Sequence, residues 1–383
     1  MRENKENSSK ALRLVVVGGG YAGMSALITI RKKLPDAQIV LIDPRDSQLL
    51  ITRLHETVHG SLHDISIPYQ DLARRFDFQH VRHALKIDAE KLRQWQEQRF
   101  IELDGQRLDF DYLLIATGAA VINPVPAGGI VDLDELCRHP LSARLEKIIA
   151  AVDKGHKQIN IIGAGPTGIQ FAFAIEHILY TARANFRITL IDGKDRLLED
   201  FPATMVGYVQ KRLAEKNIQF LNNHFFVGKL NGQIVLENRI DKQQQLLPDD
   251  LSLLLLGKKP EPLLHANTSG QVILDGVTLA NIFTAGDCSS FDDLGSNRMT
   301  MQTALRKGKA AAKNILRTAR VLNFCLPYMH QDKGYILHIG PSDAVGWVAS
   351  SSNIISGMPA CLAKEMIEMQ YTLLLEGVDS YVL

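Results

Sequence analysis

The hydrophobic pattern near the N-terminus changes within a few residues from a continuous run to a helical repeat. The segment "LRLVVVGGGYAGMSALITIRKKL", residues 12–34, opens with an apolar run rich in valine, passes through glycines and then repeats apolar residues at helical spacing. A continuous run predicts a buried strand, and the later repeat predicts a helix that packs on it. Strand, tight turn and helix in this order are typical of a dinucleotide-binding unit.

The same pattern returns in the middle of the chain. The segment "HKQINIIGAGPTGIQFAFAIEHIL", residues 156–179, again predicts a strand, a glycine turn and a helix. A further strand follows in both units: "AQIVLID" ends in Asp43 and "FRITLID" ends in Asp192. The chain therefore carries two copies of one pattern, each completed by an acid about 20 residues beyond the last glycine.

The glycine spacing makes both turns candidates for phosphate binding. The G-x-G-x-x-G spacing is met in the first unit by Gly18, Gly20 and Gly23, and in the second by Gly163, Gly165 and Gly168. Glycines allow a tight turn and close approach of a pyrophosphate, while the helix N-terminus offers free amides. The acid then accepts hydrogen bonds from ribose hydroxyls. Two complete units predict two dinucleotides, and a duplicated fold with an inactive second site is the alternative.

Composition excludes several classes of protein. The 43 basic residues nearly balance the 42 acidic ones, so the net charge of +1 does not indicate a nucleic-acid partner. Four cysteines (Cys137, Cys288, Cys325 and Cys361) lack metal-ligand spacing and fit a reducing compartment. The polar start "MRENKENSSK" lacks the apolar core of a secretory signal, and no apolar run reaches the roughly 20 residues of a membrane span. We expect a cytoplasmic protein, with a peripheral position at the inner face of the membrane as the alternative.

Two further strands connect the first unit to distant parts of the chain. "FDYLLIATGA", residues 110–119, leads into Thr117 and Gly118, and "NIFTAGDCSS", residues 281–290, leads into Gly286 and Asp287. With these segments the chain resembles the FAD-dependent pyridine nucleotide-disulfide oxidoreductase superfamily. The resemblance implies that both segments return to an FAD domain, where the aspartate of the GD motif bonds the ribityl chain. It also implies that the first turn binds FAD, tightly and without a covalent bond, and that the second binds a nicotinamide nucleotide.

One acid and an absent cysteine pair narrow the choice within that superfamily. A carboxylate such as Asp192 accepts hydrogen bonds from ribose hydroxyls but repels a 2′-phosphate, which favours NADH over NADPH as the substrate. Disulfide reductases carry a cysteine pair after the glycine-rich helix, whereas residues 44–118 contain no cysteine. The dithiol-reducing class is therefore excluded.

Longer segments resemble one branch, the type II NADH dehydrogenases, which are single-chain NADH:quinone oxidoreductases. The resemblance is carried by "DPRDSQLLITRLHETVHGSLHDISIPYQDL" (43–72), "LLLLGKKPEPLL" (253–264) and "KGYILHIGPSDAVGWVASSSNIISGMPACLAKEMIEMQY" (333–371). It covers most of the chain and implies a quinone as the electron acceptor.

Three features depart from that branch. In "TMQTALRKG", residues 300–308, Gln302 matches the family's motif beside the flavin and quinone, but Met301, Arg306 and Lys307 do not. At Gln170 the family has a glutamate near the nicotinamide; glutamine keeps the length and the hydrogen-bonding capacity but cannot ionise. The alternative is that Gln170 simply packs on its helix. The C-terminal segment also lacks the basic amphipathic helices of the family, so a homodimer contact, a lid on the flavin or a membrane-surface contact are all open roles.

Two smaller groups of residues allow other hypotheses. His55, His59 and His63 recur every four residues, but we expect no metal there and favour a polar wall near the isoalloxazine that includes Arg53, His55 and Glu56. Sulfide:quinone reductases share this architecture and use cysteines, which makes Cys137 and Cys325 a less favoured hypothesis for sulfide oxidation.

The predicted fold class is α/β, with two Rossmann-like dinucleotide-binding domains and a small α+β C-terminal module. We expect a discontinuous FAD domain at 12–120 and 265–320, an NAD(H) domain at 121–264, and the module at 321–383. Locally, "KLRQWQEQRF" (91–100) is expected to be a surface β-excursion and "IDKQQQLLPDD" (240–250) a hairpin loop.

The candidate site residues follow from the turns and from the resemblance. The catalytic candidates are Gln170 and Gln302, although the flavin carries the chemistry itself. Cofactor-binding candidates are Gly18, Gly19, Gly20, Tyr21, Ala22, Gly23, Asp43, Arg53, Ala84, Ala116, Thr117, Gly118, Gly163, Gly165, Pro166, Thr167, Gly168, Asp192, Gly286, Asp287, Met301 and Gln302. Amides at the start of the helix at Met301 would stabilise an anionic reduced ring.

The predicted activity is that of an FAD-dependent NADH dehydrogenase. Hydride would pass from NADH to the flavin N5, and electrons then to a quinone or another small acceptor. The alternative is a soluble FAD/NADH flavoprotein that responds to redox state or passes electrons to a protein partner.

Overall fold

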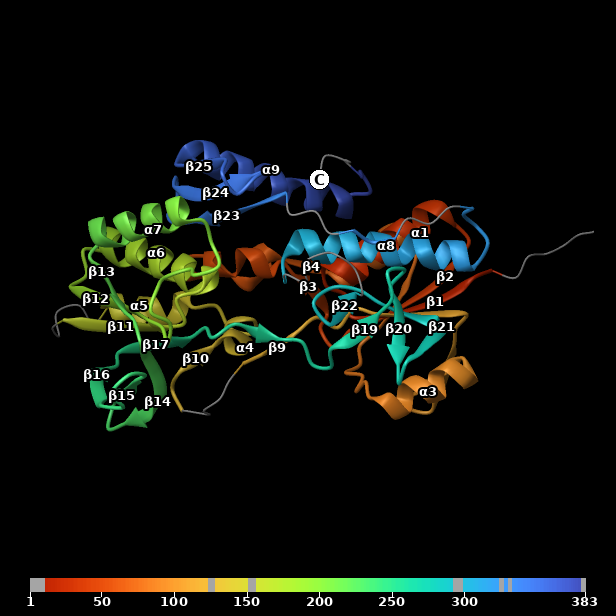
Figure 1. Ribbon diagram of the computed structural model, residues 1–383, viewed down its shortest axis with the longest axis horizontal. Coiled ribbons are helices and arrows are strands. Elements are labelled where there is room, and N and C mark those ends of the chain that lie inside the picture. The colour runs from red at the N-terminus through yellow and green to blue at the C-terminus, as the bar shows by residue number, and fades with distance from the viewer. Residues whose placement is uncertain are drawn as a thin grey trace, which may run out of the picture.

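Two mainly parallel sheets lie side by side along the long axis of the computed structural model (Figure 1). The structure describes residues 11–122, 128–150, 156–291, 299–323, 327–329 and 333–379. A smaller C-terminal segment, blue in Figure 1, lies across one side of both halves. The predicted α/β class with a C-terminal α+β segment is confirmed.

The first sheet has eight strands in the order β22-β19-β20-β21-β8-β1-β2-β5. Their bounds are β1 Arg13–Val17, β2 Gln38–Ile42, β5 Gln79–Val81, β8 Tyr112–Ile115, β19 Leu264–Ala266, β20 Gln271–Leu274, β21 Val277–Thr284 and β22 Ser289–Phe291. Strand β1 pairs in parallel with β2 and β8, and β8 pairs in parallel with β21. This pairing brings the segment before Asp287 next to the segment before Thr117, because the carboxyl ends of parallel strands meet at one edge.

Two helices pack against each other beside the first sheet. They are α1 (Tyr21–Lys33) and α8 (Met301–Thr318), drawn red and light blue in Figure 1. Residues such as Met24, Leu27 and Ile28 of α1 are fully buried, which is typical of a helix covered on several sides. A Cβ at Gly308 of α8 would overlap the backbone of Ala22, so glycine lets the two helices approach closely.

The second sheet is parallel throughout and has the order β10-β17-β11-β12-β13. Its bounds are β10 Val131–Asp132, β11 Lys157–Ile162, β12 Phe186–Ile191, β13 Ile218–Leu221 and β17 Leu251–Leu254. Its helices are α4 Leu133–Leu136, α5 Ser142–Ala150, α6 Pro166–Thr181 and α7 Ala203–Glu215. An antiparallel sheet of β14 His224–Leu230, β15 Gln233–Asn238 and β16 Gln244–Pro248 is attached to it.

The second sheet is inserted between two strands of the first. The chain leaves the first sheet after β8 and returns to it at β19. The outgoing strand β9 (Ala120–Val121) pairs with the returning strand β18 (Lys258–Lys259) in antiparallel fashion. The two crossovers therefore run side by side between the halves.

The C-terminal segment combines three antiparallel strands and a long helix. These are β23 Gly334–His338, β24 Ala344–Val348, β25 Ile354–Ser356 and α9 Met358–Leu375. Strands β23 and β24 contact α6 and α7 of the second half, and α9 contacts α1 of the first (Figure 1). The helix thus reaches the place where the two halves meet.

Two local expectations from the sequence, at 91–100 and at 240–250, are corrected by the structure. The remaining elements are β3 Ser47–Leu49, the 3-10 helices η1 Ile51–Val58 and η2 Leu62–Ile65, β4 Ser66–Pro68, α2 Tyr69–Phe76, α3 Ala89–Gln98, β6 Phe100–Leu103 and β7 Gln106–Asp109. The expected β-excursion at 91–100 is wrong, because α3 is a helix that the Asp88 carboxylate caps and whose Trp95 is buried. The expected loop at 240–250 is wrong in its second half, where β16 pairs with β15.

Candidate functional site

The two glycine turns have the same backbone geometry. Gly18 and Gly163 adopt φ of 99° and 108°, in the left-handed region that favours glycine. A Cβ on either residue would overlap the carbonyl oxygen of a neighbouring strand end, at Ala116 in one case and Leu255 in the other. The structure therefore requires glycine at the first position of both turns.

The other two glycines of each turn serve opposite purposes. A Cβ on Gly23 or Gly168 would overlap the carbonyl oxygen of the first glycine of its own turn. Gly20 and Gly165, in contrast, have nothing within 4 Å of a Cβ position. They are the N-cap residues of α1 and α6, so each turn is open at a helix end whose amides can bind a phosphate.

The two acids hold their turns in the same way. The Gly19 amide donates to Asp43 Oδ2 at 2.8 Å, and the Ala164 amide donates to Asp192 Oδ2 at 2.8 Å. In both, Oδ1 accepts a bond from the amide two residues later, at 3.0 Å from Arg45 and at 2.9 Å from Lys194.

Asp43 is enclosed by groups that the sequence did not suggest. Arg45 Nε and Nη2 donate to its two oxygens at 3.0 and 2.9 Å, and the carboxylate is only 2% exposed. Burial disfavours the charged carboxylate, but the bonds and positive charge of Arg45 outweigh it and lower the pKa of Asp43. The buried Tyr69 ring covers Gly19. A ribose hydroxyl can reach Asp43 only if the half-exposed Arg45 guanidinium turns away.

A cavity of about 450 Å³, which we call the central chamber, lies where the two halves meet. Residues of the first half, of the inserted second half and of the C-terminal segment all line it. Of the candidate residues, the central chamber brings together Tyr21, Pro166, Thr167, Gln170, Asp287, Met301 and Gln302. The first residues of α6 and of α8 thus face one space, although 134 positions separate Thr167 from Met301.

Helix α8 begins at the central chamber. The Thr300 side chain caps it by accepting a bond from the Thr303 amide at 3.1 Å. Met301 and Gln302, the first two helical residues, line the chamber. Their amides have no partner within the helix, so the positive end of the helix dipole is available to a group in the chamber.

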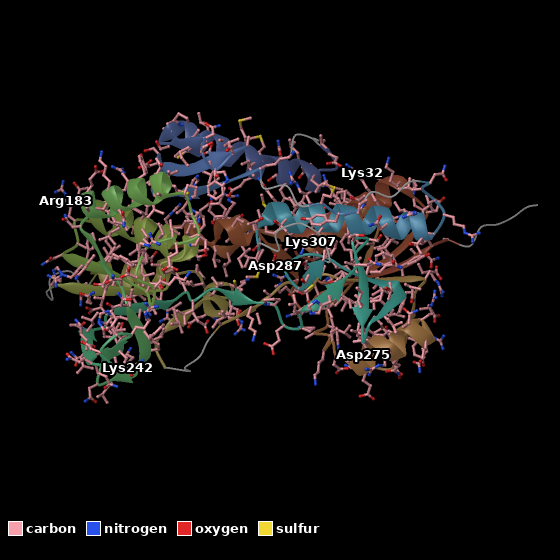
Figure 2. The ribbon with its side chains drawn as sticks, viewed as in Figure 1. Lys32, Arg183, Lys242, Asp275, Asp287 and Lys307 are labelled. Carbon is pink, nitrogen blue, oxygen red and sulfur yellow. The ribbon has the colours of Figure 1, made fainter. Side chains whose placement is uncertain are left out.

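Asp287 supplies an unpartnered carboxylate to the same space. Among the described residues it has no hydrogen-bond or ion-pair partner, and burial raises its pKa although Lys258 and Lys307 oppose the shift. Figure 2 labels Asp287 and Lys307 in the middle of the molecule. Gly286 packs against the Ala22 side chain, which places Asp287 beside the start of α1.

The observed residues fit FAD. An open glycine at a helix N-terminus suits a pyrophosphate, and a carboxylate without a partner suits the hydroxyls of a ribityl chain. The start of α8 lines the same chamber as Asp287 and suits a ring that gains negative charge on reduction.

A second cavity of about 630 Å³, which we call the histidine chamber, adjoins the central chamber. Both chambers are lined by Tyr21, Thr52, His55, Gln170, Met301 and Glu368. The histidine chamber alone is lined by Arg53, Glu56, His59 and His338, among others. Arg53 and Glu56 form a two-bond ion pair at 2.7 and 2.9 Å, so η1 gives this chamber a polar side; that it faces the isoalloxazine stays a prediction.

Two imidazoles in this region, those of the buried His55 and the half-buried His338, favour the neutral form. The rings of His55 and His338 meet edge to face with centroids 5.9 Å apart. Burial, helped by the nearby Lys364 charge, lowers the pKa of His55 well below its usual value and that of His338 to about 4. Within the described part of the chain no group of His, Cys, Asp or Glu is arranged to hold a metal ion.

Other candidates lie outside the two chambers. Ala116 contacts the first turn, Thr117 and Gly118 follow β8, and Ala84 lies in an exposed loop after β5. Cys137, Cys288 and Cys361 line neither chamber, which gives no support to sulfide chemistry, and Cys325 lies outside the described residues.

The sequence-based reasoning missed Lys258, Lys364 and Glu368. Lys364 is buried although it interrupts the apolar face of α9 formed by Ala360, Cys361 and Tyr371. A lysine on such a face is a signal that could have been used, because an ionised side chain is rarely buried without a partner.

Comparisons with known proteins agree with this fold. The chain is 24% identical to a type II NADH:quinone oxidoreductase of Staphylococcus epidermidis, with 96% of each chain covered. The structure resembles NDH2 of Plasmodium falciparum in complex with NADH, with a TM-score of 0.77, 14% identity and 94% of each chain covered. It also resembles the sulfide:quinone oxidoreductase of Aquifex aeolicus, with a TM-score of 0.75, 18% identity, and coverage of 97% of this chain and 93% of that one.

The family is defined by a direct match over most of the chain. Residues 12–308 match the model described as pyridine nucleotide-disulphide oxidoreductase. The predicted resemblance to type II NADH dehydrogenases is confirmed by the nearly full-length relatives. The chain belongs to the pyridine nucleotide-disulphide oxidoreductase family.

Proposed function

We propose that this protein is an FAD-dependent NADH:quinone oxidoreductase. The single observation that carries the proposal is the central chamber, where the start of α6 and the start of α8 face each other beside Asp287. FAD, when bound, accepts a hydride equivalent from NADH and passes the electron pair to the quinone. The nearly full-length relatives named as type II NADH:quinone oxidoreductases support the same activity.

The residues of the chain bind, orient and shield. The first turn, with Gly20 and Asp43, holds FAD, and Asp287 holds its ribityl chain. The second turn, with Gly165 and Asp192, holds NADH. Pro166, Thr167 and Gln170 then position the nicotinamide end in the central chamber, where proximity makes hydride transfer effectively intramolecular.

The same assignment divides the chain into functional parts. Residues 12–120 and 265–320 form the FAD domain, 121–264 form the NAD(H) domain, and 321–383 form the C-terminal module. Helix α9 of this module exposes Met358, Leu362, Met366 and Met369. This apolar row suits a membrane surface, a second copy or a protein partner. The four scattered cysteines suit a reducing compartment such as the cytoplasm. No helix of the described residues is long and apolar enough to cross a membrane.

The test is turnover with a short-chain quinone under anaerobic conditions. The expected result is rapid oxidation of NADH with one quinone reduced per NADH consumed. A flavin that NADH reduces but that no quinone reoxidises would overturn the quinone assignment. That outcome would support the alternative, a flavoprotein that passes electrons to a protein partner.

A further inference from the structure

A lysine of α8 is fully buried inside the first half of the molecule. Lys307 is 1% exposed, whereas its buried neighbours one turn away on the same face of the helix, Thr303, Ala304 and Ala311, are small. Lysine is rarely buried this deeply, because its ammonium loses hydration that the protein must replace. Lys307 is also one of the residues at which "TMQTALRKG" departs from the motif of the type II NADH dehydrogenases. The position therefore calls for a functional explanation.

The Lys307 ammonium connects α8 to the turn that carries Asp287. Its Nζ donates to the Ser289 carbonyl oxygen at 2.7 Å. Ser289 in turn closes this turn, because its amide and its hydroxyl both donate to the Gly286 carbonyl oxygen, at 3.2 and 2.7 Å. Asp287 lies between these two residues, so one charged side chain fixes the turn from which the carboxylate reaches the central chamber.

The surrounding packing fixes the place of Lys307 relative to Asp287. The Nζ atom lies 5.0 Å from the centroid of the Phe291 ring, where a cation is favoured. A Cβ on Gly308 would overlap the backbone of Ala22, and Gly286 packs on the Ala22 side chain. Helix α8, the turn and the start of α1 thus meet at one point in the middle of the molecule, where Figure 2 labels Asp287 and Lys307.

The charge of Lys307 acts on Asp287 as well. Burial raises the pKa of Asp287, and the Lys258 and Lys307 cations oppose this shift. Lys258 belongs to the crossover strand β18 and is half-buried, whereas Lys307 lies in the same half as Asp287 and is fully buried. An ionised carboxylate accepts stronger hydrogen bonds from hydroxyl groups than a neutral carboxyl does. A buried cation at this place therefore favours the form of Asp287 that binds hydroxyls best.

We propose that Lys307 is a positioning residue for FAD: its buried ammonium holds the turn of Asp287 and keeps that carboxylate ionised, so that it accepts hydrogen bonds from the ribityl hydroxyls. The inference rests on the assignment of FAD to the first half in the proposed function. Lys307 lines neither chamber, so it acts through Asp287. The consequence is that FAD retention depends on pH and that Lys307 sets this dependence.

Other charged or titratable groups lie around Asp287 and contribute to any pH profile. They are Cys288 of the same turn, Tyr21 of α1, His55 of η1, Lys258 of β18, Tyr335 of β23, and Lys364 and Glu368 of α9. The variants below leave all of these groups in place. Differences between the variants therefore report on Lys307 and Asp287.

The test measures FAD release from the full-length protein by the fluorescence of the free flavin, at pH 5.5 and pH 8.5. Lys307→Gln retains a hydrogen-bond donor for the Ser289 carbonyl but carries no charge. It should bind FAD about tenfold more weakly than the unaltered protein at pH 5.5 and within about twofold at pH 8.5, because loss of the cation favours the protonated carboxyl at the lower pH. Lys313→Gln, at an exposed position of the same helix, should behave as the unaltered protein at both.

Three further variants separate the charge from the tether. Lys307→Met removes both donor and charge and should weaken FAD binding at both pH values. Lys307→Arg keeps the charge and should keep the pH dependence of the unaltered protein. In an Asp287→Asn background, Lys307→Gln should cause no pH-dependent loss, because no carboxyl remains to titrate at that position.

A comparison without any change at Lys307 keeps the inference testable if Lys307→Gln does not fold. FAD affinity should fall from pH 8.5 to pH 5.5 more steeply in the unaltered protein than in Asp287→Asn. Equal slopes there, equal losses at both pH values in Lys307→Gln, or no loss in Lys307→Gln would overturn the inference. An unaltered protein that binds no FAD, or that binds FAD and turns over no quinone, would instead overturn the proposed function.

Discussion

The two glycine turns have the same backbone geometry, but the basic residue that follows the acid of each turn behaves differently. Arg45 and Lys194 stand two residues after the acid of their turns, and both donate a backbone amide to it. The Arg45 side chain then folds back on Asp43, whereas Lys194 reaches away to Glu199 at 3.3 Å. The first acid is therefore clamped and buried, and the second stays accessible. This difference suits a resident cofactor at the first turn and an exchangeable substrate at the second.

The largest expected effects come from filling the glycine that packs helix on strand. Gly23→Ala and Gly168→Ala face the same backbone overlap, which we expect to cost roughly 2–4 kcal/mol of local stability. Gly23→Ala should lose FAD and most of its folded yield, whereas Gly168→Ala should keep FAD and lose NADH binding. Flavin content and thermal unfolding measure the difference.

A matched control is Gly207→Ala in α7. This glycine is exposed in a helix and has open space at its Cβ position, so alanine should stabilise by about 0.5–1 kcal/mol. If Gly168→Ala released FAD while Gly23→Ala retained it, the two sites would have to be exchanged.

Removal of Asp43 or Asp192, the acids of the two turns, is expected to have the next largest effect on cofactor binding. Asp43→Ala leaves the Arg45 guanidinium without its partner and frees the Gly19 amide, so FAD retention should fall. Asp192→Ala should raise the KM for NADH about tenfold, equivalent to 1.4 kcal/mol, and leave the flavin content unchanged. Equal loss of FAD and of NADH binding in both variants would contradict the assignment of FAD to the first turn and NADH to the second.

The C-terminal segment provides a prediction about pH. The pKa of His338 is lowered from 6.5 to about 4 in the folded protein, so the folded state disfavours the protonated ring. The neutral His338 ring therefore contributes to the free energy of unfolding above pH 6.5, and this contribution is lost as the pH falls toward 4. Allowing for partial exposure, the loss at pH 5 is about 1 kcal/mol, and His338→Gln should remove it. Urea unfolding at pH 7 and pH 5 measures the change; an unaltered pH dependence in the variant would show that other groups cause it.

The smallest expected effects come from removing the basic side chains that follow the two acids, Arg45 and Lys194. Arg45→Ala should change FAD affinity by less than about tenfold, because the ribose can then use the Asp43 oxygens that the guanidinium occupied. Lys194→Ala should leave NADH binding within about twofold, since exposed ion pairs contribute little. A large loss of NADH binding in Lys194→Ala would mean that the second turn is also held by its cation.

Features whose residues lie close together in the sequence could be predicted from it. Each turn could be predicted because its glycines, its acid and its helix start lie within about 30 residues of one another. The helix at Trp95 was missed because its segment is mostly polar: only Leu92 and Trp95 are buried, and two apolar positions are too few to show a period.

The chambers could not be predicted in the same detail. Gln48 and Tyr371 are 323 positions apart and bond each other, and through such contacts α9 brings Lys364 and Glu368 to the start of α6. The sequence identified Gln170 as the position where an acid is absent. Only the fold shows that Glu368 lines the same two chambers.

An anaerobic titration of the purified protein with NADH tests the central claim most directly. We predict a yellow protein with the absorbance of oxidised flavin, which NADH bleaches at lower concentration than NADPH and a short-chain quinone restores. A colourless protein that cannot be reconstituted with FAD would contradict the account.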